Sequence, residues 1–130
     1  EHLQDDVKTL ALLSSRMQQG GVLAVTVPAY QWLWSEHDAL HQHFRRYTKK
    51  TLKASLEAGG FSVLYISHWN VALLPVVWIL RLLKKGGGNN LMPPAPIDAL
   101  LKAWVSLEAL LMPLFSYPFG VSIVAVAIKN

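Results

Sequence analysis

Residues 29–47 carry most of the side chains in this chain that could bind a ligand or move a proton. The candidates for a general base or a substrate contact are His37, Asp38, His41 and His43. Imidazole and carboxylate groups are the usual general bases of proteins, because their pKa values lie near neutrality or can be tuned toward it. The segment therefore predicts a site of proton transfer or substrate binding.

Aromatic and basic side chains share the same segment. Tyr30, Trp32 and Trp34 could wall an apolar pocket, but their pattern is more typical of core anchors. Arg45 and Arg46 could hold a carboxylate or phosphate group, because the guanidinium fork matches those anions. An equally good interpretation is that the two arginines pair with nearby acidic groups and organise the loop.

The histidines also bear on metal binding. His37 and His41 are one helical turn apart, with His43 close behind. Zinc sites use a defined set of three or four ligands, and neither an HExxH pattern nor a clear third ligand is present. We therefore expect no metal site from this pattern. His68, farther along, is expected to be a packed or surface histidine.

The elements that must position these residues follow from apolar patterns. A helix capped by Asp5 or Asp6 is predicted to run to about residue 19 and to end at Gly20-Gly21. The run Val22–Val27 predicts a strand buried on both faces of a parallel sheet. Ligands of α/β folds bind at the carboxyl ends of such strands, which is where residues 29–47 begin.

Further elements are predicted toward the carboxyl end. Residues 29–47 are expected to form a loop with one or two helical turns. Thr48 is expected to cap a helix that ends at Gly59-Gly60. Strands are predicted over Phe61–Ile66 and Val121–Ile128.

Residues 69–115 predict an apolar helical hairpin. Residues 69–80 are uncharged but too short a run to span a bilayer, which takes about 20 helical residues. Residues 109–128 are long enough but are interrupted by prolines. The hairpin is therefore expected to lie on a membrane surface, or to cover the sheet or a second subunit, and the sequence favours these two options equally.

Composition narrows the class of protein. The chain has 130 residues, 52% of them apolar, which argues against disorder. Its net charge of +4 comes from scattered basic pairs, which favour a solvated face over a nucleic-acid stripe. It has no cysteine, so disulfides and thiolate metal sites are excluded, as is usual for a cytoplasmic protein.

Several short motifs occur together, most specifically over residues 20–61. They are Val27-Pro28-Ala29-Tyr30, Leu33-Trp34-Ser35, Asp38, His43, Arg45-Arg46-Tyr47-Thr48, Leu52 and Gly60-Phe61. Their order resembles the class I S-adenosylmethionine-dependent methyltransferases, in the bacterial branch with a VPAY…LWS…D…HxRRYT signature. Glu1-His2 resembles the tail of the family's L-E-H element after its fourth strand.

The resemblance implies an α/β, Rossmann-like fold with a seven-stranded sheet whose final strand is antiparallel. The assignments are Val22–Val27 as the fifth strand, Phe61–Ser67 as the sixth and Val121–Lys129 as the seventh. The chain is then a single partial domain, with residues 1–68 and 116–130 as the sheet core. Residues 69–115 are an insertion between the last two strands.

The resemblance also implies what this chain lacks. The family binds its methyl donor, S-adenosylmethionine, through a Gly-rich turn after the first strand and an acidic residue ending the second, and neither is present. Gly86-Gly87-Gly88 lies between lysines and asparagines, not between a strand and a helix, so it is not a phosphate loop. We expect the C-terminal part of a methyltransferase that begins just after the fourth strand.

The resemblance implies roles for individual residues in methyl transfer. The protein mainly aligns a nucleophile with the methyl group and removes a proton where needed. His2 is expected nearest the donor. The catalytic candidates are His37, Asp38 and His43, and the substrate-binding candidates are Tyr30, Trp34, Arg45, Arg46 and Tyr47.

The apolar hairpin suggests an apolar or lipid-linked acceptor and peripheral contact with the inner membrane face. The alternative is a non-catalytic domain that pairs with itself or with a missing half, because an incomplete sheet leaves an unpaired edge. We expect a homo-oligomer when the chain is expressed alone, and no nucleic-acid partner. Whether this chain alone is an enzyme stays open.

Overall fold

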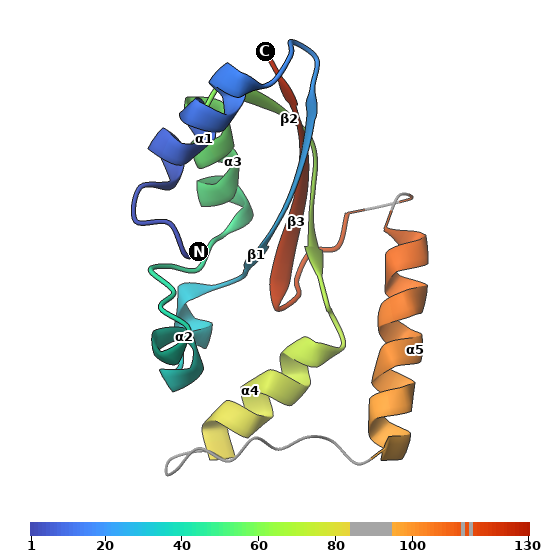
Figure 1. Ribbon diagram of the computed structural model, residues 1–130. Coiled ribbons are helices and arrows are strands. Elements are labelled where there is room, and N and C mark those ends of the chain that lie inside the picture. Colours follow the sequence, from blue (N-terminus) through green and yellow to red (C-terminus); the bar gives the residue numbers. More distant parts are fainter. Residues whose placement is uncertain (84–94, 113, 115) are drawn as a thin grey trace.

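The fold is centred on a small sheet of three strands (Figure 1). The computed structural model describes residues 1–83, 95–112, 114 and 116–130. In spatial order the strands are β1 (Val22–Pro28), β3 (Ser122–Lys129) and β2 (Phe61–Trp69). The final strand, β3, pairs antiparallel with both neighbours, as expected. β1 and β2 therefore run in the same direction, and their carboxyl ends lie at the same end of the sheet.

Two helices cover one face of the sheet (Figure 1). They are α1 (Asp6–Arg16) and α3 (Lys49–Ala58). Asp5 caps α1 by accepting from the Lys8 amide at 2.9 Å, and Thr48 caps α3 in a reciprocal box with Thr51. The helix starts expected from the sequence are thus confirmed, although α1 ends earlier than expected.

The core lies between this helical layer and the sheet. Leu56 of α3 and Phe61 and Ile123 of the sheet are fully buried, and alternate residues of β3 point toward them. α1 and α3 meet closely at Gly59, where an added Cβ would lie 2.5 Å from the Cβ of Leu10. Glycine at this position therefore sets the spacing of the two helices.

The expectation that β1 belongs to a parallel sheet and is buried on both faces is wrong, since both strand pairs of the described sheet are antiparallel. Val22 is 62% exposed, and Ala24 and Thr26, on the same face, are also exposed. Within the described part of the chain, β1 pairs only with β3, and no helix covers this face of it. A run of small apolar residues favours a strand, but it does not specify which elements cover that strand.

The described residues of the apolar region between β2 and β3 form two helices. They are α4 (Leu73–Leu83) and α5 (Ala95–Leu111), whereas Gly86-Gly87-Gly88 lies outside the described residues. In Figure 1, α5 stands on the side of the sheet opposite α1 and α3, and α4 lies beyond the carboxyl ends of β1 and β2. Among the helices described here, none is long and apolar enough to cross a membrane.

The carboxyl end of α5 is fixed to the sheet. Glu108 is buried, and its carboxylate accepts from the amide of Val71, just before α4, at 3.1 Å. The hydroxyl of Tyr65 on β2 donates to the carbonyl of Met112 at 2.7 Å. α5 also presents exposed apolar side chains along its length, which include Leu100, Trp104 and Leu110.

Candidate functional site

The loop after β1 begins and ends at one point of the sheet. The Tyr30 amide donates to the Tyr47 carbonyl at 2.8 Å, and the Tyr47 amide donates to the Pro28 carbonyl at 2.9 Å. Between these bonds the chain forms a 3-10 turn, η1 (Gln31–Leu33), and a short helix, α2 (Glu36–Leu40). The predicted loop with helical turns is confirmed, and it lies at the carboxyl end of β1.

Asp38 is the centre of this loop. Its fully buried carboxylate accepts from the Ser35 amide at 2.9 Å, from Nε and Nη2 of Arg46 at 2.9 and 3.0 Å, and contacts Nδ1 of His43 at 3.0 Å. Burial alone would raise the pKa of Asp38, but the hydrogen bonds from His43, Arg46 and Ser35 lower that pKa to about 2. A carboxylate this well paired organises the loop and is a poor proton acceptor.

The two arginines are both paired with acids. The side chain of Arg46 is 9% exposed and also donates to the Ala29 carbonyl at 3.2 Å. Arg45 donates to Asp6 at 2.9 Å, and the Tyr47 hydroxyl donates to the other oxygen of Asp6 at 2.8 Å. This geometry favours the interpretation in which the arginines organise the loop. The substrate-binding roles of Arg45, Arg46 and Tyr47 stay predictions.

Burial and hydrogen bonding also shift the pKa values of Asp6 and Tyr47. Burial would raise the pKa of Asp6, but hydrogen bonds from Tyr47 and Ser55 and the charge of Arg45 lower it. Burial and the Asp6 carboxylate raise the pKa of Tyr47. Asp6 is therefore charged and Tyr47 neutral near pH 7, and together they join α1, α3 and the loop.

The N-terminal segment lies against this loop. The Phe44 amide donates to the Glu1 carbonyl at 2.8 Å, and the rings of His2 and His43 meet edge-on with centroids 4.5 Å apart. His41 is farther away, with its ring centroid 6.2 Å from that of His43. His37 lies on α2, but its side chain is outside the described part of the chain. Two of the predicted site residues, His2 and His43, are thus brought together.

Three rings form a stack beside the loop. Tyr30 lies between Trp32 and His68, with ring centroids 5.4 and 5.2 Å away. Tyr30 has a φ of +58°, which is costly for a bulky side chain and requires strong surrounding contacts. His68 is 5% exposed, so it is packed, one of the two alternatives expected.

His68 is held as a neutral ring. Its Nδ1 lies 3.4 Å from the Tyr117 carbonyl, which only accepts, so Nδ1 carries the hydrogen of that contact. Burial and the nearby charge of Lys49 lower the pKa of His68. Its Nε2 is buried without a hydrogen-bond partner among the described residues.

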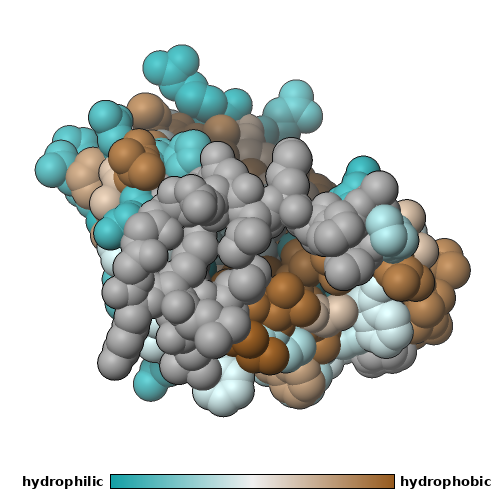
Figure 2. All heavy atoms as spheres, turned by 90° about the horizontal axis from the view of Figure 1, so that it is seen from below, coloured by the Kyte–Doolittle hydropathy of each residue, from teal (hydrophilic) through white to brown (hydrophobic). Residues whose placement is uncertain are grey.

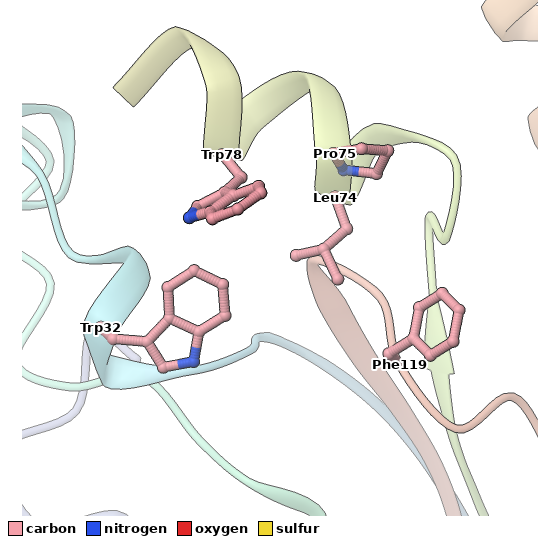
Figure 3. A pocket seen from close by; sticks show the side chains of 5 residues that line it. All are labelled: Trp32, Leu74, Pro75, Trp78 and Phe119. Carbon is pink, nitrogen blue, oxygen red and sulfur yellow. The ribbon is translucent and has the colours of Figure 1, made fainter. Parts of the chain in front are cut away.

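An apolar cavity opens beside the ring stack (Figure 3). It has a volume of about 350 Å³ and is lined by Trp32, Leu74, Pro75, Trp78 and Phe119. In Figure 3 the rings of Trp32 and Trp78 lie on facing sides of it, one from the loop and one from α4. The cavity brings together three segments that are far apart in the sequence.

The expectation that Trp32 is a core anchor is wrong. Its side chain is 60% exposed, whereas the next residue, Leu33, is fully buried and anchors the turn. Tyr30 and Trp34 are half-buried. Sequence reasoning also missed four of the cavity residues, because the helical pattern of α4 does not show which of its faces meets the loop.

Comparison with known protein families found no family that matches this chain, and comparison with curated proteins found no matching sequence.

Proposed function

We propose that this chain is the acceptor-side, C-terminal part of a class I S-adenosylmethionine-dependent methyltransferase whose acceptor is apolar or lipid-linked. One observation carries the proposal. His2, which the motif order puts nearest the donor, lies against His43, a predicted catalytic residue, with ring centroids 4.5 Å apart. Both lie by the loop that follows β1, at the end of the sheet where α/β folds bind their ligands.

The proposed proton acceptor is His43. The Asp38 carboxylate only accepts hydrogen bonds, so the Nδ1 atom of His43 carries the hydrogen in their 3.0 Å contact. In the neutral ring the other nitrogen, Nε2, carries no hydrogen, so it can receive a proton from an acceptor hydroxyl or amine. Asp38 acts in this proposal as a positioning residue that fixes the ring.

The proposed acceptor class follows from the cavity. All five lining residues are apolar, and the Trp32 ring connects the cavity to the stack of Tyr30 and His68. Such a cavity selects an apolar group by excluding water from it. The donor would supply an electrophilic methyl group. Among the described residues, the motif assigns only His2 to the donor.

Contact with a membrane surface is part of the same proposal. Several apolar side chains of α4 and α5 are about half or more exposed: Trp78, Ile79, Leu100, Trp104, Leu107 and Leu110. Figure 2 shows hydrophobic atoms gathered on the underside of the molecule. Exposed apolar patches of this kind mark interaction surfaces, and a lipid-linked acceptor would be met at a bilayer.

Calorimetric titration with S-adenosylmethionine tests the proposal. We expect saturable heat from the chain and about tenfold weaker binding for His2→Gln, since His2 is the proposed donor-side group. The matched control is His41→Gln, which should bind the donor like the parent chain. An absence of heat at millimolar donor would reject donor binding by this chain and favour the alternative below.

The alternative is a non-catalytic domain that dimerises through its sheet. The observation that favours it is the edge of β1, which has no strand partner within the described residues, together with the exposed Val22 beside it. An uncovered apolar edge promotes pairing with a second chain. Sedimentation equilibrium tests this, because Val22→Lys should convert a dimer to a monomer without changing donor binding.

A further inference from the structure

Three potential metal ligands converge where the N-terminal segment meets the loop. Ligand atoms of Glu1, His2 and His43 all lie within 4.8 Å of one another. The His2 Nε2 atom is 4.0 Å from a carboxylate oxygen of Glu1. Two imidazole nitrogens and one carboxylate oxygen are a donor set typical of zinc and of non-haem iron. The sequence analysis considered only His37, His41 and His43 and expected no metal site, because Glu1 and His2 are far from the loop in sequence.

The most buried of the three is His43. Its side chain is 14% exposed, and its Nδ1 is bound to the fully buried Asp38, which Arg46 holds in turn. A carboxylate that accepts from one nitrogen of a histidine fixes the ring and leaves the other nitrogen as a metal ligand. Asp38 and His43 already have this arrangement. The charge of Arg46 is offset by Asp38, so it does not oppose a cation at His43.

The N-terminal segment is also fixed in place. Glu1 is bound to the loop by the Phe44 amide at 2.8 Å, and Arg45 donates to both the Gln4 carbonyl and the Asp6 side chain. The segment therefore keeps Glu1 and His2 beside His43 without a metal. A site that is partly preorganised pays less ordering entropy when an ion binds.

We propose that Glu1, His2 and His43 bind a divalent transition-metal ion such as Zn²⁺, with Asp38 as the group that orients His43. Ligand atoms around tetrahedral zinc lie about 3.3 Å apart, so atoms now within 4.8 Å of one another must approach by up to about 1.5 Å. The side chain of His2 is 59% exposed and free to rotate inward. A fourth position then stays open to water or to a substrate oxygen. The site rests on this geometry alone. A bound ion would occupy Nε2 of His43, the atom proposed above as the proton acceptor, because Nδ1 contacts Asp38, so His43 cannot serve both roles at once.

The experiment is a titration of the full chain with Zn²⁺, and with Co²⁺ to read the coordination from its visible spectrum. For this titration the chain is prepared without a histidine tag and with an acetylated α-amino group, so that only side chains offer nitrogen ligands. We expect one ion per chain and a tetrahedral or five-coordinate Co²⁺ spectrum. His43→Gln, His2→Gln and Glu1→Gln should each weaken binding by about tenfold or more.

Two matched variants control the experiment. His41→Gln and Glu36→Gln change an exposed histidine and an exposed glutamate of the same loop that lie outside the group, and both should bind Zn²⁺ like the parent chain. Circular dichroism checks that every variant is folded. The proposal is overturned if the parent chain does not bind at 1 mM Zn²⁺, or if the control variants lose as much affinity as the ligand variants. Neither outcome depends on donor binding, so it is distinct from a failure of the proposed function.

Discussion

The two faces of the sheet differ in how completely they are covered. On the face toward α1 and α3, Leu56, Phe61 and Ile123 have no exposed surface. On the other face, Val124 and Val126 are only half-buried, although they alternate with buried residues in the same strand. One strand thus has a closed face and a partly open face. The closed face stabilises the fold, and the open face has apolar surface available for binding.

The two sides of the sheet also differ in how completely their buried polar groups are paired. Near α1 and α3, the carboxylates of Asp6 and Asp38 are fully paired. Toward α4 the cavity is apolar, and in the described chain the ring nitrogens His68 Nε2 and Trp69 Nε1 are buried without partners. Substitutions near α1 and α3 should therefore change the free energy of unfolding, and substitutions toward α4 should change the binding of a ligand.

The largest effect is expected for Asp38→Ala. This change leaves the Arg46 guanidinium, 9% exposed, without its charged partner, and breaking a buried ion pair in this way costs about 3–5 kcal/mol. Urea unfolding measures the loss. Glu36→Ala, on the surface of the same short helix, is the control and should change the free energy of unfolding by less than about 0.5 kcal/mol. A loss below about 1 kcal/mol for Asp38→Ala would mean that the paired side does not stabilise the fold as inferred.

The second effect is the pH dependence that Asp38 gives to the free energy of unfolding. Its pKa is lowered from 3.8 to about 2 by folding, so its contribution is fully present above about pH 4 and is lost as the pH falls through 2. That contribution is about 2 kcal/mol. Urea unfolding at pH 4.5 and pH 2.5 measures it in the parent chain and in Asp38→Asn. An equal acid loss in Asp38→Asn would assign the effect to other carboxylates.

A third, smaller effect is the loss of stability on removing a tyrosine hydroxyl, which should differ between the two faces. Tyr47→Phe removes a hydrogen bond to the charged Asp6 and should cost about 1.5 kcal/mol. Tyr65→Phe, on the other side, removes a bond to the neutral Met112 carbonyl and should cost about 0.5–1 kcal/mol. Thermal unfolding of the two variants under the same conditions makes the comparison. The reverse order would contradict the division between the two faces.

Local signals in the sequence predicted much of the fold. The Thr48 cap, the end of α3 at Gly59 and the three strands depend on residues near in sequence, and they lie within a few residues of their expected positions. The coverage of β1 could not be predicted, because it depends on where other elements lie. Its valines favour a strand whether one face or both are buried.

The candidate site was predicted less well. The loop and its histidines were found because their residue types are unusual for a loop. Pairing of the two arginines with nearby acids was one of two open interpretations, and the partner of Arg46 was not specified, since composition does not show how a loop folds back. Trp32 was expected in the core but is exposed, whereas the neighbouring Leu33 is buried, because one step along a 3-10 turn moves a side chain from the core to the surface.

The smallest effect on stability is expected on α5. Leu100 and Leu110 are 71% and 73% exposed, so their joint replacement by serine should change the free energy of unfolding by less than about 0.5 kcal/mol per site. The same variant should lose most of its flotation with vesicles of anionic phospholipid, since it removes apolar surface from the proposed membrane face. The control is Leu12→Ser, at an exposed position of α1, the helix that covers the closed face of the sheet. This variant should float like the parent chain. A different result is a loss of more than 1 kcal/mol in the α5 variant, with unfolding that depends on protein concentration in the parent chain but not in the variant. That result would mean that a second copy of the chain covers this face in solution. The open face would then be a subunit interface, and the difference between the two faces would be one of oligomeric state.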